Sequence, residues 1–100
     1  MNLDELNKKI LEWAKDKDLL KPENKDRQFL KVAEEFGEIA AGMAEDDMSL
    51  VEDGIGDLFI TLVILANQCG MTLEGCVELA YEMIKDRKGK TTDGIFIKDE

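Results

Sequence analysis

Apolar residues recur at three- and four-residue spacing through most of the chain, which is the repeat of an amphipathic α-helix. The only proline, Pro22, interrupts this repeat once. The pattern predicts an all-α fold in a single domain covering residues 1–100. The expected helices cover about Leu3–Lys17, Arg27–Glu45, Ser49–Cys69 and Leu73–Lys88.

Local signals mark the ends of the predicted helices. Asp26 and Thr72 stand where N-caps of the second and fourth helices are expected. Ser49-Leu50-Val51-Glu52 fits a capping box that would start the third helix. Gly70 and Gly89 follow the third and fourth helices, as glycines that end helices do.

Residues 90–100 do not continue the helical spacing of apolar residues. Asp93-Gly94 is a turn signal, and Ile95-Phe96-Ile97 is a short run of β-type residues. We expect a short C-terminal hairpin or extended arm here.

The third predicted helix has more apolar surface than one small chain can bury. From Leu58 to Ala66 it is apolar on nearly every side, apart from Thr61, and a helix of this kind is normally buried all round. Four helices of one chain cannot easily cover it, so we expect a second copy to do so.

The net charge of the chain limits the kinds of partner that it is expected to bind. The chain has 23 acidic and 13 basic residues, a net charge of −10. Nucleic-acid binding depends on neutralising phosphates with Lys and Arg, so a nucleic acid polymer is not an expected partner. An acidic protein can still bind a phosphate compound if a divalent cation bridges the two.

The two cysteines, Cys69 and Cys76, fit no zinc spacing, and there is no histidine. Their apolar neighbours predict buried free thiols in a reducing compartment. The first residues do not resemble a signal peptide, and no apolar run approaches the roughly 20 residues of a membrane span. These features favour a cytoplasmic protein with no membrane partner.

Asp57 is the acidic residue that helical periodicity explains least. It lies on the same side of the third helix as Ile60 and Ile64, where an ionised carboxylate is costly unless it is paired or bound to a metal. Asp53 lies one turn earlier on the same face. Both stay ionised only if a positive charge lies between them.

The second helix offers further carboxylates. Periodicity places Glu34 and Glu38 almost opposite its apolar stripe, where a solvated role is the plain interpretation, and Glu35 nearer the boundary. If the second and third helices pack antiparallel, these residues can meet Asp53 and Asp57. Oxygen-only sites of this kind suit Mg²⁺, Mn²⁺ or Ca²⁺.

These segments resemble a known family. Glu34-Glu35-Phe36-Gly37-Glu38 is similar to the E-E-x-x-E element of the MazG-like all-α nucleoside triphosphate pyrophosphohydrolases, and Gly56-Asp57-Leu58-Phe59 resembles the end of their second acidic element. The run Lys85–Gly89 is similar to the basic run on the family's last helix. The chain departs from the family where the E-x-x-D pattern has a glutamate, because Gly54 stands there, and where Glu82 replaces a usual asparagine.

The resemblance implies a four-helix bundle, a homodimer or homotetramer, and Mg²⁺-dependent hydrolysis of nucleoside triphosphates or deoxynucleoside triphosphates to the monophosphate and pyrophosphate. Mn²⁺ is a possible substitute for Mg²⁺. Glu34 or Glu38 would act on the attacking water. The resemblance assigns the metal to Glu35, Glu38, Asp53 and Asp57, and substrate contacts to Lys85, Arg87, Lys88, Lys31 and Trp13.

Other interpretations stay open for the substrate residues. Lys85, Arg87 and Lys88 suit the last turn of a helix, where cations are favoured. Lys31 suits an ion pair with Glu35 one turn on, and Trp13 suits core packing. For the whole chain, the rivals are a catalytically degenerate family member and an acidic helical adaptor that acts through oligomerisation.

Overall fold

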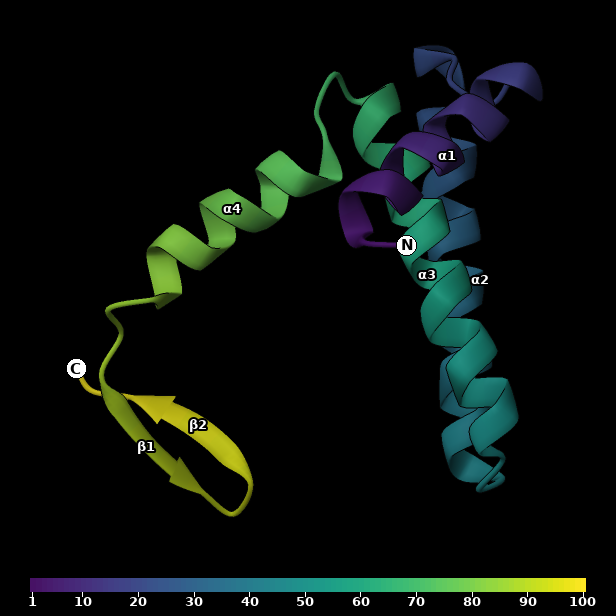
Figure 1. Ribbon diagram of the computed structural model, residues 1–100. Helices are drawn as coiled ribbons and strands as arrows, with labels where there is room; N and C mark the ends of the chain where they lie inside the picture. The colour runs from purple at the N-terminus through teal and green to yellow at the C-terminus, as the bar shows by residue number, and fades with distance from the viewer.

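The computed structural model describes residues 1–100, which are mostly helical (Figure 1). A 3-10 turn, η1 (Pro22–Asn24), precedes the second helix, and β1 (Gly89–Thr92) pairs antiparallel with β2 (Ile95–Lys98). The mainly helical fold and the C-terminal hairpin are thus confirmed. No helix has the length and hydropathy needed to cross a bilayer. The helices are α1 (Leu3–Asp16), α2 (Lys25–Ala44), α3 (Met48–Gln68) and α4 (Leu73–Ile84).

An antiparallel pair of long helices, α2 and α3, forms the body of the molecule. Helix α1 packs against α3, whereas α4 contacts α3 alone and the hairpin contacts no helix. In Figure 1, α4 and the hairpin lead away from the α2–α3 pair as an arm. The expected four-helix bundle is therefore wrong for a single chain, because α4 does not pack as its fourth member.

The first three helices end in the same way. At the end of α3, Gly70 has a φ of 78°, and the N–H of Met71 reaches back to the carbonyl of Ala66. This is a Schellman ending, in which one left-handed residue reverses the chain. Asp18 and Asp46 take the left-handed position after α1 and α2, with φ values of 61° and 54°. The expectation for Gly70 is confirmed.

Two of the expected N-caps are wrong. Asp47, not Ser49, caps α3, since its carboxylate accepts a hydrogen bond from the N–H of Leu50. The Schellman ending of α2 places Asp47 directly before α3, so the helix begins before the capping box does. Asp26 lies inside the first turn of α2, because η1 leads into the helix and Asn24 precedes it. Thr72 caps α4 as expected, by accepting from the N–H of Gly75.

Helix α4 ends earlier than expected. It stops at Ile84, so the basic run follows the helix instead of forming its last turn. The reason lies in the hairpin, whose ladder extends to Lys88, where the carbonyl accepts from the N–H of Asp99 at 2.8 Å. Before this ladder the chain turns, with the N–H of Arg87 donating to the carbonyl of Ile84 at 2.9 Å.

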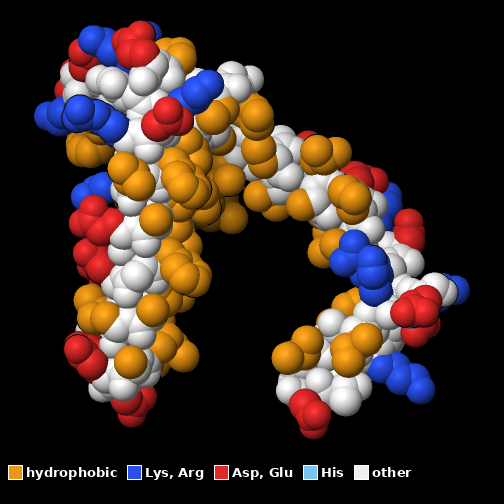
Figure 2. All heavy atoms as spheres, turned by 180° about the vertical axis from the view of Figure 1, so that it is seen from behind, with side chains coloured by type: hydrophobic (Ala, Val, Ile, Leu, Met, Phe, Trp, Pro, Cys, Tyr) orange, Lys and Arg blue, Asp and Glu red, His pale blue; other side chains and the backbone are white.

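Little of the chain is buried. The buried apolar residues are Ala14, Val63, Ile64 and Ala66, and three of them belong to α3. Figure 2 shows hydrophobic side chains along the side of the α2–α3 pair that faces the arm, and along the facing side of the arm. The two thiols are free, but Cys69 is exposed and Cys76 half-buried, so their expected burial is wrong for one chain. Exposed apolar surface of this kind is typical of sites that contact another protein, a membrane or a ligand.

Gly54 allows α2 and α3 to approach closely. A Cβ atom at this position would lie 2.7 Å from Cγ1 of Ile39 on α2. We therefore expect Gly54→Ala to lower the free energy of unfolding by about 1–3 kcal/mol, the range for overpacking. Gly37 is the matched control, because a Cβ there meets nothing within 4 Å.

Gly37→Ala should raise stability by up to about 1 kcal/mol through helix propensity. Urea denaturation of both variants measures the two effects. Equal changes in stability for Gly54→Ala and Gly37→Ala would contradict the close packing.

Candidate metal centre and adjoining pocket

Three carboxylates converge where α2 packs on α3. Glu35 and Glu38 lie one turn apart on α2, Asp57 comes from α3, and one carboxylate oxygen of each lies within 4.8 Å of the others. Glu35 is buried, with 7% of its surface exposed, and the other two are half-buried. The predicted meeting of acidic residues from the two helices is confirmed for these three.

The register of the helix pair explains which carboxylates meet. A Cβ at Gly42 of α2 would touch Val51 of α3, and a Cβ at Gly54 of α3 would touch Ile39 of α2. In both pairs the residue numbers add up to 93. A residue of α2 therefore lies beside the residue of α3 whose number brings the sum to about 93. Asp57 therefore lies between the levels of Glu35 and Glu38.

Glu35 is the most unusual group of the cluster. Its Oε2 atom is buried and has no hydrogen-bond partner. Burial raises the pKa of Glu35, and the neighbouring carboxylates of Glu38 and Asp57 raise it further, while Lys31 lowers it. A buried, unpaired carboxylate oxygen beside two more carboxylates is a position that lacks a positive charge.

A divalent cation fits this donor set. The cluster offers only oxygen ligands, with no histidine and no thiol, which suits Mg²⁺ and Mn²⁺. Mg–O distances of about 2.0–2.1 Å keep ligand oxygens within roughly 4.2 Å of one another, so a small inward movement of the side chains suffices. Glu38 and Asp57, being half-buried, leave positions open to water or phosphate.

The structure does not bring the other acidic candidates into the cluster. Asp53 is exposed and lies level with Ala40, where α2 has no carboxylate. Glu34 is exposed, and its carboxylate lies 3.6 Å from the ammonium of Lys31. The ion pair expected between Lys31 and Glu35 is thus formed with Glu34 instead.

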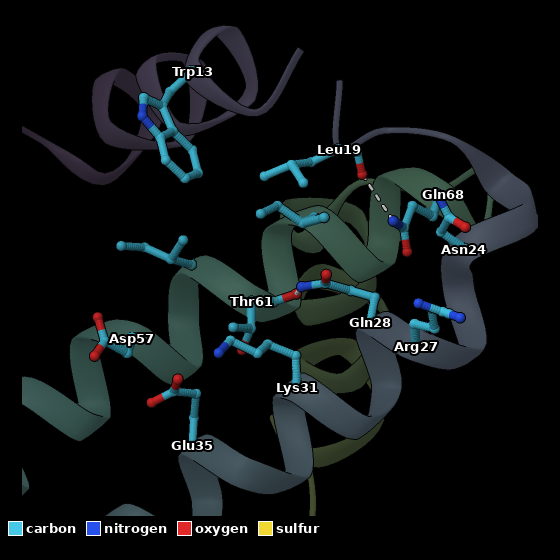
Figure 3. Close-up of a pocket in the computed structure, with 12 residues that line it drawn as sticks. Trp13, Leu19, Asn24, Arg27, Gln28, Lys31, Glu35, Asp57, Thr61 and Gln68 are labelled. Carbon is cyan, nitrogen blue, oxygen red and sulfur yellow. Dashed lines mark hydrogen bonds between the residues drawn. The ribbon is translucent and has the colours of Figure 1, made fainter. Parts of the chain in front are cut away.

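A pocket of about 560 Å³ adjoins the cluster (Figure 3). Trp13 lies on its wall and is 52% exposed, so the alternative of core packing is wrong for this side chain. Lys31 also lines the pocket, close to Glu35. The space runs from the carboxylates towards the loop after α1. Its remaining lining includes Leu19, Asn24, Arg27, Gln28, Ile60, Thr61, Ile64 and Gln68.

Sequence reasoning missed the polar residues at the far end of this pocket. Arg27 and Gln28 precede Lys31 on α2, and the amide of Gln28 donates to the carbonyl of Thr61 at 3.1 Å. Gln68 is buried and lies on α3. A glutamine at the end of an apolar helix was the available signal, since a buried amide needs partners.

The basic run is not part of this site within one chain. Lys85, Arg87 and Lys88 are exposed on the arm, which contacts the body only through α3. The ammonium of Lys85 pairs with Glu82 at 2.7 Å. The predicted substrate contacts of these residues therefore require a second chain or a movement of the arm.

Comparison with known proteins gives one curated relative and no family. The chain is 42% identical over 67 residues to a protein of Haemophilus phage HP1, described as an uncharacterized 18.2 kDa protein in the rep-hol intergenic region. The match covers 67% of this chain but 41% of the phage protein, so the chain spans less than half of that relative's length. No protein-family model and no solved structure matches.

Proposed function

We propose that this chain hydrolyses nucleoside or deoxynucleoside triphosphates to the monophosphate and pyrophosphate with the help of Mg²⁺, as MazG-like enzymes do. The observation that carries the proposal is the convergence of Glu35, Glu38 and Asp57, with the unpaired buried oxygen of Glu35 among them. The adjoining pocket has a volume typical of small-molecule sites.

The three residues of the cluster share one role in this proposal, and Glu38 has a second. Glu35, Glu38 and Asp57 would hold the cation, which would neutralise phosphate oxygens and make the α-phosphorus easier to attack. Glu38, at the half-buried edge, orients a water and accepts its proton as the water oxygen bonds to the α-phosphorus. The bond from the α-phosphorus to the bridging oxygen breaks, and pyrophosphate leaves.

Cationic side chains on the pocket wall fit the phosphate chain. Lys31 and Arg27 line the pocket from one side of α2, and Arg in particular binds phosphate oxygens in a bidentate way. Trp13 is available for stacking on a base. Glu34, held by Lys31 outside the cluster, is the weaker of the two candidates for activating water.

The test is pyrophosphate release from a panel of ribo- and deoxyribonucleoside triphosphates, with Mg²⁺, with Mn²⁺ and with EDTA. The proposal expects cation-dependent release of equal amounts of monophosphate and pyrophosphate. No release from any triphosphate by the folded protein would refute it. The chain would then be better explained as a degenerate relative or as an acidic adaptor.

We also infer that the working form is a homo-oligomer, a dimer or tetramer. Charge along the chain supports this inference. The stretch from Val32 to Ile84 has twelve acidic residues and no Lys or Arg. The following stretch from Lys85 to Lys98 has five basic residues and two acidic ones. A basic arm with exposed apolar residues suits the acidic, apolar body of a second copy.

A mixing experiment tests whether the arm acts in trans. A chain with Asp57→Asn lacks the cation site, and a chain with Lys85→Gln, Arg87→Gln and Lys88→Gln lacks the basic run. We expect each variant to be nearly inactive alone, and the mixture to regain about a quarter of wild-type activity if the assembly is a symmetric dimer.

Sedimentation of the same samples must give the mass of two or four chains. A mixture that forms mixed oligomers without regaining activity would show that the basic run acts within its own chain. A monomer at micromolar concentration would refute the oligomer.

A further inference from the structure

Gln68 occupies an unusual position at the end of the pocket furthest from the carboxylates. It is 4% exposed, and its Nε2 donates to the carbonyl of Leu19 at 2.8 Å. Its Oε1 is buried and accepts from no group. Because a carbonyl can only accept, the contact with Leu19 fixes which end of the amide is which. Gln68 therefore lines the pocket with a lone acceptor that is covered in the free chain.

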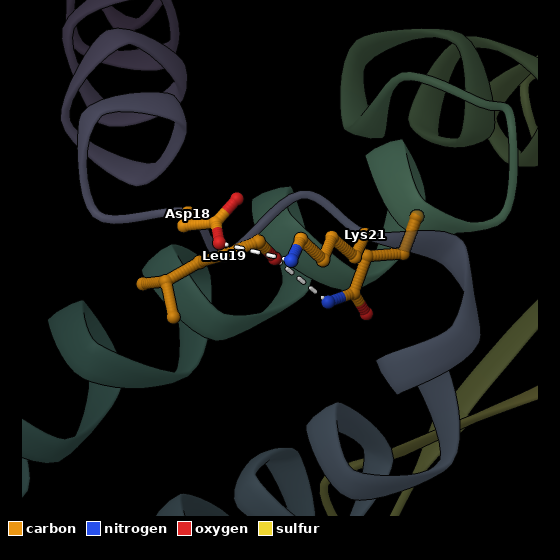
Figure 4. A network of polar contacts seen from close by, with 4 residues as sticks. Asp18, Leu19 and Lys21 are labelled. Atoms are coloured by element: carbon orange, nitrogen blue, oxygen red, sulfur yellow. Dashed lines mark hydrogen bonds and ion pairs between the residues drawn. The ribbon is translucent and has the colours of Figure 1, made fainter.

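The loop after α1 holds this amide in place. Asp18 takes a left-handed conformation, and the N–H of Leu19 closes the helix end on the carbonyl of Ala14 at 2.8 Å. The carboxylate of Asp18 pairs with Lys21 at 3.0 Å, across the turn that carries Leu19 (Figure 4). Rotating the Gln68 amide by half a turn would place its Oε1 against the carbonyl of Leu19, which has no hydrogen to donate.

The pocket joins Gln68 to the carboxylates along one side of α3. Asp57, Thr61, Ile64 and Gln68 all line it, at spacings of four, three and four residues. At 1.5 Å per residue, Gln68 lies about 16 Å along the helix axis from Asp57. One end of the space is suited to a cation and phosphates, and the other end has the fixed acceptor of Gln68, while Trp13 stands on the facing wall formed by α1.

We propose that Gln68 reads the base of the nucleotide, with its Oε1 accepting a hydrogen bond from an N–H group on the base edge while Trp13 stacks on the ring. This inference rests on the proposed function, because it assumes a nucleotide whose phosphates lie at the carboxylates. A nucleobase fits because it combines a flat ring with N–H donors on one edge. Oε1 is covered in the free chain, so a base reaches it only when the side chain that covers it moves.

The hydrogen-bonding pattern of Gln68 predicts which bases should bind weakly. Since Nε2 is occupied, Gln68 accepts but does not donate, so a base must offer an amino or imino hydrogen. Adenine and cytosine offer an amino group, and uracil, thymine and guanine offer an imino group. A base whose donor is removed or methylated leaves the buried acceptor unpaired and should bind more weakly.

Trp13 makes the test direct, because it is the only tryptophan. Its fluorescence is followed while nucleoside 5′-monophosphates are added to the whole protein with Mg²⁺. Two matched pairs are compared: adenosine with purine riboside monophosphate, and uridine with 3-methyluridine monophosphate. We expect saturable quenching by at least one parent compound, and at least tenfold weaker binding of its donor-free partner.

Gln68→Met removes the acceptor at similar size and should abolish this preference. Gln28→Met, which removes another amide from the same pocket, should keep it. The comparison of matched nucleotides in the unaltered protein stands even if Gln68→Met fails to fold.

Equal binding of parent and donor-free compounds would overturn the proposal and leave the Gln68 acceptor to a buried water. Absence of quenching by any nucleotide, with pyrophosphate release intact, would also overturn it without touching the proposed activity. Quenching with donor preference but no pyrophosphate release would keep the base site and refute the reaction.

Discussion

Replacing Asp57 with asparagine is expected to lower cation-dependent pyrophosphate release by at least about a hundredfold, the scale of losing one major electrostatic group at a reacting centre. Asp57 is the only carboxylate that α3 adds to the cluster. An amide in its place keeps the size of the side chain and removes the charge that holds the cation. The rate at saturating Mg²⁺ and substrate, together with the circular dichroism of the variant, measures the effect in a folded protein.

Asp53→Asn is the matched control for this substitution. It makes the same chemical change one turn earlier on the same helix, at an exposed position outside the cluster. Its activity should stay within about threefold of the unaltered protein, as expected for a surface charge. If both variants lost activity equally, Asp53 would be a ligand and the register argued above would be wrong.

The second large effect concerns stability. Glu35→Gln should make the metal-free protein more stable at pH 7 by about 1 kcal/mol, since it removes a buried charge that faces two carboxylates. In a chain of this size that amounts to roughly 4–8 °C in Tm. The same variant should lose activity and should gain no stability from Mg²⁺, whereas the unaltered protein should gain it.

The stability difference between Glu35→Gln and the unaltered protein should depend on pH. The folded state raises the pKa of Glu35 above its ordinary value of 4.5. A carboxyl group with a raised pKa binds its proton more tightly in the folded chain than in the unfolded chain. Its contribution to folding stability is therefore fully present below pH 4.5 and is lost as pH rises through the raised pKa. In EDTA, the advantage of Glu35→Gln should therefore be absent near pH 4 and grow towards pH 7.

Thermal unfolding of the unaltered protein and of Glu35→Gln from pH 4 to pH 7 measures the difference in stability. The other carboxylates titrate alike in both proteins, so their effects cancel in this difference. Glu34→Gln, an exposed neighbour on the same helix, should show little change at any pH. A stability difference for Glu35→Gln that does not vary with pH would contradict the assigned pKa.

Much of this site was predictable from the chain alone, because burial and charge conflict at Asp57. The apolar run after it shows that the carboxylate is poorly placed unless something positive is near. The three glutamates of α2 are harder to separate. Periodicity puts Glu34 and Glu38 on one solvated face, yet Glu38 is half-buried and Glu34 is exposed. Only the position of α3 decides between them.

Other features depend on the register and on partners, which a single sequence does not specify. Asp53 and Asp57 share a face by periodicity, but only Asp57 lies between the levels of Glu35 and Glu38. Gly54 stands where the resembling family has a glutamate, and Ile39 leaves no room there for a side chain. Helix α4 was predictable from its apolar spacing, but the sequence does not say what its apolar stripe packs against.

The placement of all three carboxylates on α2 and α3 has a consequence for the order of folding. These helices are joined by a short turn, Glu45–Asp47, so the contacts between them are local in sequence and form quickly. The cation site can thus exist before the arm has found its place. Docking of arms between chains, as we propose, is a bimolecular event. It should therefore be the slow step of refolding, with a rate that rises with chain concentration.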